Sequence, residues 1–267
     1  MKKIAILMTC YNRVNTTLLC LEALLQQRSI EDCKLDVWLV DDGSPDKTGD
    51  IVKKKYSSVN VIHSKGGLFW SKGMRLAWDK AAEACDYDFY IWLNDDVVLK
   101  PDAIVNLLSD YEKINSVVVG TFSSNDKEDE VSYGATNELP DSVAPKKGVC
   151  GMNGNLVLVP SEIFKQVGPI CAKYHHQYGD YDYGLLLRRK GFDYYSSSHF
   201  CGVCPQQPER YLHLKGRSVV GRIKLLVQPK GYSIHDAYLY KKRNWGLVRA
   251  IISVFHITLK VVLGIEK

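Results

Sequence analysis

Short apolar runs alternate with segments of helical periodicity along the first two thirds of the chain. Six runs have the length and composition of buried strands: Lys3–Met8, Leu35–Val40, Val59–His63, Phe89–Leu93, Val117–Phe122 and Leu156–Val159. Apolar residues at helical spacing follow the first four runs, at residues 18–25, 51–56, 68–84 and 103–108. This alternation of strands and helices predicts an α/β fold with a mostly parallel sheet and right-handed crossovers.

The run Phe89–Leu93 ends abruptly in three polar side chains, Asn94, Asp95 and Asp96. Open α/β sheets bind ligands at the carboxyl ends of their strands, and neighbouring carboxylates repel each other unless a cation compensates. Oxygen donors of this kind suit Mg²⁺ or Mn²⁺ shared with a phosphate. The alternative is that Asp95 and Asp96 only turn the chain and cap the next helix.

Polar segments also follow the three earlier strands, and a parallel sheet would bring them to the same edge. These segments are Thr9–Arg13, Asp41–Ser44 and the loop Ser64–Gly67. The paired glycines of the loop lack the spacing of a P-loop or of a dinucleotide-binding fingerprint. They would still allow close backbone approach to a nucleotide, with Lys65 or Arg75 near a phosphate. A plain strand–helix turn is the alternative.

Two later segments carry further candidate chemistry. Gly151–Asn155 precedes the last predicted strand, and its glycines and amides would either admit a polyhydroxylated ligand or form a turn. Asp180 and Asp182 precede a helical segment at residues 185–190. A carboxylate in this position is either a helix cap or a general base that accepts a proton from a hydroxyl group.

Charge is distributed unevenly along the chain, whose net charge is +5. Residues 215–267 contain eleven Lys and Arg against two acidic residues, a balance of +9, so residues 1–214 carry −4. A basic tail on an acidic body indicates an anionic partner surface, either a membrane or a nucleic acid, or else a solvated helix face. The apolar stretch after Met1 is too short for a signal peptide, and the eight scattered cysteines fit a cytosolic protein with reduced thiols.

The segment 245–263 is strongly apolar, but three basic or histidine residues interrupt it, which makes it a poor bilayer span. Arg249, Ser253, His256 and Lys260 recur at spacings of four, three and four, along one stripe of a helix. We expect an amphipathic helix that lies on the face of a membrane, anchored by the preceding basic residues. The alternative is a helix buried in the core or in a dimer.

Taken in order, the motifs resemble those of family 2 glycosyltransferases with the GT-A fold. They are Thr9–Arg13, Val40–Ser44, the loop from Gly66 to Gly73, Leu93–Asp96, Gly151–Asn155, and Gly179–Asp182 with Leu187–Phe192. Phe69-Trp70 and Arg243-Asn244 resemble the branch that builds bacterial surface polysaccharides, including rhamnosyltransferase-like members. The resemblance, which covers roughly residues 3–195, implies a Rossmann-like GT-A domain that we place over residues 1–212. From their charge and apolar pattern, residues 213–267 are expected to form a basic, partly amphipathic helical extension.

The resemblance also implies the donor and its contacts. The donor would be a nucleotide-diphospho-sugar, with UDP, dTDP or GDP as its nucleotide. Thr9, Tyr11 and Arg13 would line the nucleoside pocket, and Asp41 or Asp42 would hold the base or the ribose. Further contacts expected in the donor site are Lys65, Gly67, Asn94 and Asp95.

The chemistry implied is a single in-line displacement that inverts the anomeric carbon. Asp96 matches the last carboxylate of the family's DxD motif and would bind Mn²⁺ or Mg²⁺, with Asn94 and His213 as further expected ligands. Near His213, the cations of His213–Arg217 would grip a diphosphate. Asp180 matches the family's base, although Gly179 stands where the family often has Glu.

The predicted function is therefore transfer of a sugar to a hydroxyl of a glycan or lipid-linked acceptor in bacterial surface-polysaccharide synthesis. We expect a cytoplasmic enzyme, peripheral on the inner face of the membrane, with a homodimer left open. A nucleic-acid partner would not explain the acids clustered at the sheet edge. Two alternatives remain: a sugar-phosphate nucleotidyltransferase, whose glycine-rich signature Thr9–Arg13 lacks, and a catalytically degenerate subunit that only binds nucleotide sugars.

Overall fold

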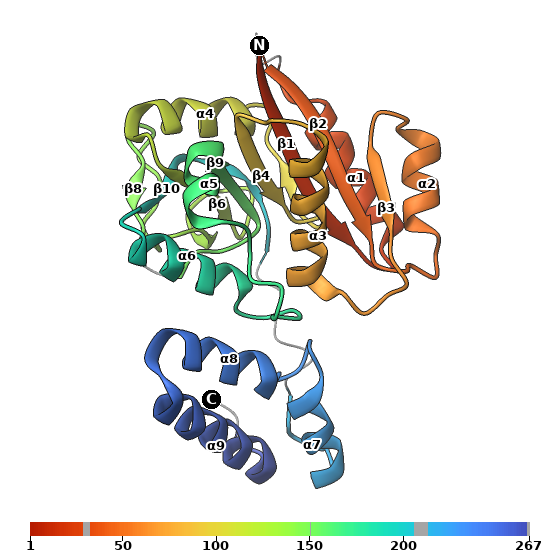
Figure 1. Cartoon of the computed structure of the whole chain (residues 1–267), viewed down its shortest axis with the longest axis vertical. Helices are drawn as coiled ribbons and strands as arrows, with labels where there is room; N and C mark the ends of the chain where they lie inside the picture. The colour runs from red at the N-terminus through yellow and green to blue at the C-terminus, as the bar shows by residue number, and fades with distance from the viewer. Residues whose placement is uncertain (29–32, 150, 206–212, 266–267) are drawn as a thin grey trace.

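The apolar runs of the sequence become the strands of one ten-stranded sheet that is covered by helices on both sides (Figure 1). The computed structural model describes residues 1–28, 33–149, 151–205 and 213–265. Its strands are β1 (Lys2–Cys10), β2 (Cys33–Asp41), β3 (Asn60–His63), β4 (Phe89–Leu93), β5 (Val98–Leu99), β6 (Val117–Ser123), β7 (Val131–Tyr133), β8 (Lys146–Lys147), β9 (Leu156–Pro160) and β10 (Tyr194–Val203). All six predicted strands are present, as β1, β2, β3, β4, β6 and β9.

The helices are α1 (Val14–Leu25), α2 (Thr48–Lys55), α3 (Phe69–Ala84), α4 (Ala103–Ile114), α5 (Ser161–Val167), α6 (Gly179–Arg189), α7 (Val219–Val227), α8 (Ile234–Trp245) and α9 (Leu247–Leu263). The first four occupy the predicted helical segments. Their apolar positions recur at the helical spacing that one covered face requires. The sequence analysis identified α9 but neither α7 nor α8, and it left β10 unassigned.

The strand order is β3-β2-β1-β4-β9-β6-β10-β5, with β7 paired to β6 and β8 paired to β10. The four N-terminal strands are mutually parallel, and β10 is parallel to β6. Strand β9, in contrast, runs antiparallel to both of its neighbours, β4 and β6. The short strands β5, β7 and β8 also pair antiparallel with their neighbours. The predicted α/β class with a mostly parallel sheet is confirmed, and β9 is its longest antiparallel strand because it follows a loop excursion rather than a helical crossover.

The register of the strands brings polar segments together at one edge. Thr9 lies opposite Val40 and Cys10 opposite Asp41, while Leu7 lies opposite Trp92. Strands β1, β2 and β4 therefore end close to one another. The segments that follow them leave the sheet on the same side, as the parallel arrangement predicted.

The core has two layers because side chains of a strand alternate between the two faces of the sheet. In β1, Ile4, Ile6 and Met8 pack beneath α1, α2 and α4. Ala5 and Leu7 pack on the opposite face, beneath α3, α5 and α6. Both faces of β1 are thus covered, which explains why its sequence is continuously apolar.

The C-terminal helices α7, α8 and α9 form a separate layer below the sheet, with α8 next to α6 (Figure 1). They have a small core of their own, made of Leu214, Leu225, Leu226 and Val261. Among the residues that the structure describes, no helix has both the length and the apolar character needed to cross a membrane.

Candidate active site

A carboxylate pair and one arginine occupy the end of β4. Arg13 follows β1, and its Nη1 lies 3.3 Å from Asp95 Oδ1 and 2.9 Å from Asp96 Oδ2. The hydroxyl of Thr17 donates a second hydrogen bond to Asp95, at 3.0 Å. Burial raises the pKa of Asp95 to about 7; Arg13 opposes the shift and the Asp96 carboxylate adds to it. Asp95 is buried, whereas a quarter of the Asp96 side chain is exposed, so Asp96 is the carboxylate that a ligand reaches.

Asn94 connects this pair to the rest of the site. Its Oδ1 accepts a hydrogen bond of 2.6 Å from Trp70 Nε1, and its Nδ2 donates one of 2.6 Å to Asn155 Oδ1. Its backbone N–H also donates to Asn155 O, at 2.9 Å. Both ends of the Asn94 amide are therefore engaged by protein groups. This arrangement suits a residue that holds the loop in position better than it suits the metal ligand expected from the sequence.

Asp180 lies in the first turn of α6 and has no cationic partner at hydrogen-bond distance among the described contacts. Its Oδ2 accepts from the Gly154 backbone N–H at 3.0 Å, and its Oδ1 from the Tyr181 N–H at 2.9 Å. Burial raises the pKa of this carboxyl to about 6, although both backbone hydrogen bonds act to lower it. A half-buried carboxylate with a raised pKa has the properties of a general base.

The indole of Trp70 brings the Asn94 and Asp180 segments to one place. A Cβ at Gly154 would lie 2.5 Å from Trp70 Cζ2 and 3.4 Å from the Cβ of Asp180, so only glycine fits between them. The neighbouring Nε1–H of the same indole donates to Asn94. Asp180 is thus linked to Asn94 through Gly154 and Asn155, and the acids of β4 and α6 share one region rather than opposite sides of the molecule.

Asp41 and Asp42 support the loops around this region. The oxygens of Asp41 accept from the backbone N–H groups of Ser44 and Gly49, at 3.1 and 3.2 Å. Asp42 accepts from Ser64 Oγ at 2.7 Å and from the N–H groups of Leu68 and Phe69, at 3.0 and 2.8 Å. Both carboxylates are buried. The structure therefore gives both of them loop-bracing contacts, whereas the sequence predicted a role on the base or ribose.

The remaining predicted donor residues surround the same edge. The Thr9 hydroxyl faces α3, since a Cβ at Gly73 would lie 2.4 Å from Thr9 Oγ1. Tyr11 is 49% exposed, and Lys65 is exposed beside the paired glycines. Gly67 has a φ of +85°, with open space where a side chain would begin, so its backbone is accessible to a ligand.

Sequence reasoning missed Lys230, which lies in the loop between α7 and α8. Its Nζ lies 6.0 Å from the centre of the Tyr11 ring. Partial burial and the charge of Arg13 lower the pKa of Lys230, while Asp95, Asp96 and Asp42 act in the opposite direction. The lysine therefore lies beside Tyr11, close enough to Arg13 and the carboxylate pair for their charges to act on it. No motif marks it, because its position depends on how the C-terminal helices dock.

His176 is a second residue that only the structure reveals in this region. Burial lowers its pKa to about 4, and the charges of Lys230 and Arg13 lower it further, while Asp236 opposes them. Its ring faces Phe69 at 6.3 Å between centroids. His176 is therefore a neutral imidazole at neutral pH, on the side of the site that the C-terminal helices cover.

Two buried aspartates dock the C-terminal helices onto the segment that carries Asp180. Asp182 accepts from Arg243 Nη2 at 3.2 Å and from Asn244 Nδ2 at 2.8 Å. Asp236 accepts from the backbone N–H groups of His175, His176 and Gln177, at 3.0 to 3.2 Å. Of the two acids that the sequence left open, Asp182 is thus a structural anchor. Arg243-Asn244 supplies its partners.

The oxygen atoms around Asp96 suit the binding of a divalent cation. Asp95 and Asp96 are hard oxygen donors, and their mutual repulsion is offset among the described residues by one close guanidinium. His213 is exposed, and its backbone carbonyl accepts from Arg217 Nε at 2.8 Å. Among the contacts of the described residues, none brings its imidazole to the carboxylate pair. Within the described ranges, one cluster of three metal-binding side chains occurs elsewhere: His175, His235 and Asp236. There the Asp236 oxygens already accept from three backbone N–H groups and from both imidazoles.

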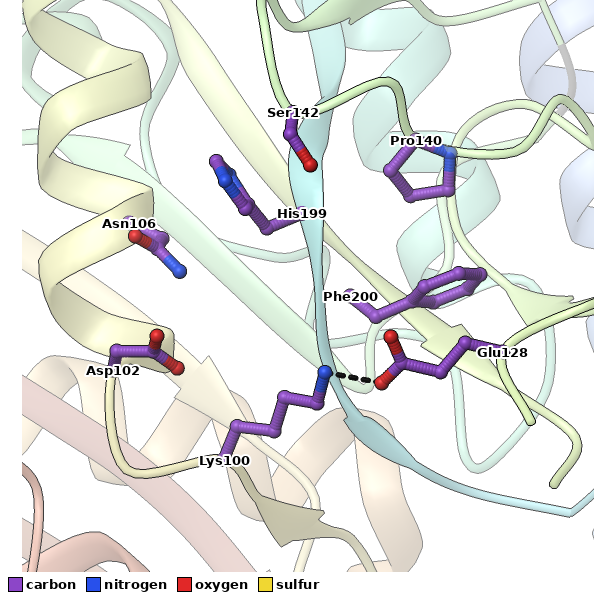
Figure 2. A pocket seen from close by; sticks show the side chains of 8 residues that line it. All are labelled: Lys100, Asp102, Asn106, Glu128, Pro140, Ser142, His199 and Phe200. Carbon is purple, nitrogen blue, oxygen red and sulfur yellow. Dashed lines mark ion pairs between the residues drawn. The ribbon is translucent and has the colours of Figure 1, made fainter. Parts of the chain in front are cut away.

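A separate hollow of about 240 Å³ lies between the start of α4 and β10 (Figure 2). Its lining includes Lys100 and Glu128, which form an ion pair, and the side chains of His199 and Phe200. None of the predicted site residues lines it. We therefore do not assign the candidate chemistry to this hollow.

A profile described as glycosyl transferase family 2 matches residues 5–191. None of the curated protein sequences matches the chain at a significant level.

Several solved structures share the fold. A mannosyltransferase, PcManGT from Pyrobaculum calidifontis, solved in complex with GDP-Man and Mn²⁺, has a TM-score of 0.58 and 15% identity, covering 99% of this chain and 76% of that one. Residues 1–349 of S. aureus TarS give 0.57 and 13%, covering 98% and 81%. The same fragment with UDP-GlcNAc gives 0.57 and 12%, covering 98% and 82%. At these identities the similarity shows the fold alone, and the GT-A class is confirmed.

Proposed function

Because the chain belongs to glycosyl transferase family 2, we propose that it is a metal-dependent, inverting hexosyltransferase. It moves a sugar from a nucleotide-diphospho-sugar to a hydroxyl of a glycan or lipid-linked acceptor. One observation carries the proposal: the Trp70 indole packs against Gly154 beside Asp180 and donates to Asn94 beside the carboxylate pair. A base and an anion-handling cluster therefore flank one space, as a displacement at a sugar carbon requires.

Asp180 accepts the proton in the proposed reaction. The acceptor oxygen forms a bond to the anomeric carbon while the bond from that carbon to the diphosphate oxygen breaks. The bonding electrons leave with the diphosphate, and the hydroxyl proton passes to the Asp180 carboxylate. Attack from the face opposite the leaving group inverts the anomeric configuration. The raised pKa of Asp180, about 6, makes it a stronger base than an ordinary carboxylate while leaving it largely ionised at pH 7.

The leaving diphosphate needs positive charge rather than a proton. Lys230 and Arg13 supply two cations at the carboxylate pair. Asp96, the more exposed of the pair, is the residue that would hold Mg²⁺ or Mn²⁺, with Asp95 and Asn94 shaping its loop. A bound divalent ion would supply charge stabilisation to the departing phosphate oxygens.

The biological setting remains part of this proposal. The dipeptides Phe69-Trp70 and Arg243-Asn244 favour the branch that builds bacterial surface polysaccharides, with rhamnosyltransferase-like members. Nucleotide-sugar chemistry and the free cysteines of the described residues favour the cytoplasm. Trp70 joins the two halves of the site, and Arg243 docks α8 onto α6. These contacts support a functional interpretation of both dipeptides.

A thermal-shift screen tests the function directly. UDP-, dTDP- and GDP-sugars are each added with Mn²⁺, with Mg²⁺ or with a chelator, and one nucleotide class should raise the melting temperature by several degrees in a metal-dependent manner. The sugar that binds is then incubated with acceptor glycans, and NMR follows the anomeric configuration of the product. Retention of configuration would contradict the single displacement. Stabilisation by a nucleoside triphosphate and a sugar phosphate, instead of a nucleotide sugar, would favour the nucleotidyltransferase.

A further inference from the structure

Helix α9 presents a continuous apolar face to solvent. Val248, Ile252, Phe255, Leu259 and Leu263 are each between 45% and 70% exposed. Their spacings of four, three, four and four place them on one side of an α-helix. Soluble proteins rarely expose contiguous apolar surface of this kind unless it binds something.

This face is not the one that holds α9 in the fold. The helix packs through Val261, which is fully buried in the small C-terminal core, and through Ile257, which packs against that core. Ala250 is buried in the same direction along the helix. The helix therefore buries one apolar stripe and exposes a second one. Folding accounts for the first stripe alone.

Basic residues border the exposed face. Arg249, His256 and Lys260 lie along the adjacent stripe, and Arg249 and His256 are exposed. At the start of the helix, Trp245 is 39% exposed, and Lys241 Nζ lies 4.6 Å from the centre of its ring. An apolar face with flanking Lys and Arg and a Trp at its end matches the chemistry of the lipid–water interface.

Helix α7 adds to the same character. Val219, Val220, Ile223 and Val227 are 45% to 70% exposed, and α7 packs against α9. In Figure 1, α7 and α9 lie at the end of the molecule opposite the N-terminus, so the catalytic sheet does not cover them. Apolar exposure is therefore a property of this whole end of the protein.

We propose that α9 docks the protein on an anionic lipid bilayer. Its exposed apolar face enters the boundary between headgroups and acyl chains, and its basic stripe lies against lipid phosphates. A second copy of the chain fits this face less well, because residues 215–267 carry a balance of +9 and two such segments would repel each other. The inference rests on the helix surface alone. If the proposed function also holds, docking brings the site to a lipid-linked acceptor.

Vesicle co-sedimentation of the full chain tests the proposal without measuring activity. Vesicles of phosphatidylcholine alone are compared with vesicles that contain roughly one third phosphatidylglycerol, at low and at high salt. We expect binding to the anionic vesicles that weakens as salt increases. Phe255→Glu should weaken vesicle binding about tenfold or more, because the bilayer loses contact with an aromatic side chain and a negative charge is added.

Leu19→Glu is the matched control, since Leu19 is 59% exposed on α1 of the catalytic domain and the change in charge is the same. Leu259→Glu repeats the test on α9. It replaces Phe255→Glu if circular dichroism shows that the Phe255→Glu protein is unfolded. Absence of wild-type binding to anionic vesicles overturns the proposal, as does equal binding by the α9 and α1 variants. A wild-type dimer that Phe255→Glu dissociates, without vesicle binding, would assign the face to a second copy instead.

Discussion

The two acidic segments of the site have opposite electrostatic surroundings. Asp95 and Asp96 share the guanidinium of Arg13 and lie within reach of Lys230. Asp180 has two backbone N–H groups and no close cation among the described contacts. The first segment can therefore manage the charge of a metal and a diphosphate, whereas the second leaves a carboxylate with no cation beside it to oppose proton transfer. Identical side chains obtain different chemistry from the charges placed around them.

A second comparison lies within α6 itself. Asp180 and Asp182 are two residues apart, yet Asp182 is buried against Arg243 and Asn244. Residues at this spacing point to different sides of a helix. The side toward the C-terminal helices has an anchor, and the side toward Trp70 has the candidate base.

The largest effect should come from Asp180→Asn. Removing the base should lower kcat at least about a hundredfold, because general base catalysis contributes ~10²–10⁴-fold. Donor affinity should stay nearly unchanged, since the carboxylate pair and its cations are untouched. Initial rates and donor titrations measure the two effects separately. Turnover near that of the wild type would remove Asp180 from the catalytic role.

Asp96→Ala should affect the carboxylate pair at the end of β4 rather than the proposed base. Loss of the more exposed carboxylate should weaken donor binding in the presence of Mn²⁺ by about tenfold or more. Binding measured with a chelator present should change little. Calorimetric titrations of the matching nucleotide with and without Mn²⁺ measure this difference, and identical titrations for the two proteins would contradict a metal role.

The pH dependence of kcat/KM should show the ionisation of Asp180, the residue proposed to accept the proton. Asp180 must be ionised to accept a proton, and its pKa is about 6. Below that pH, kcat/KM should fall by about tenfold per pH unit, and above it the value should level off. A profile recorded between pH 4.5 and about 8 measures this limb. A flat profile across pH 6 would mean that another group takes the proton.

Lys230→Met should have the smallest effect. The lysine keeps contact with solvent, so its attraction for a diphosphate is partly screened, and donor affinity should fall by roughly fivefold with kcat little changed. Lys224→Met, on α7 of the same basic segment, serves as the control. Equal losses in the two variants would show that Lys230 acts only through the general charge of the C-terminal helices.

Local sequence patterns predicted most of the sheet but not its C-terminal part. Six strands of the first 160 residues are short apolar runs with clear polar ends, so length and periodicity identify them. The two- and three-residue strands β5, β7 and β8 have no such pattern. Strand β10 mixes serines with aromatic residues, as in Ser196-Ser197-Ser198, and its buried serines find partners such as Asp110. Those partners are distant in sequence, so no local pattern could reveal the strand.

The candidate site divides in the same way. The acids at the end of β4 and Asp180 were identifiable because their residue types follow strands or begin a helix in family order. The roles of Asn94, Asp41 and Asp42 were not, because each depends on hydrogen bonds to residues far along the chain. The assignments of metal, base and donor contacts stay predictions until the variants are measured.

The sequence by itself determined six of the strands and the first four helices, which polar residues end those strands, and that residues 215–267 combine basic residues with an apolar stretch. These properties depend on composition and spacing along one stretch of backbone. Tertiary structure alone decided that Trp70 joins two acidic segments, that Lys230 lies beside Tyr11, and which stripe of α9 is left exposed. Each of these depends on docking between distant elements, and docking is set by packing and buried hydrogen bonds that no local stretch of residues contains.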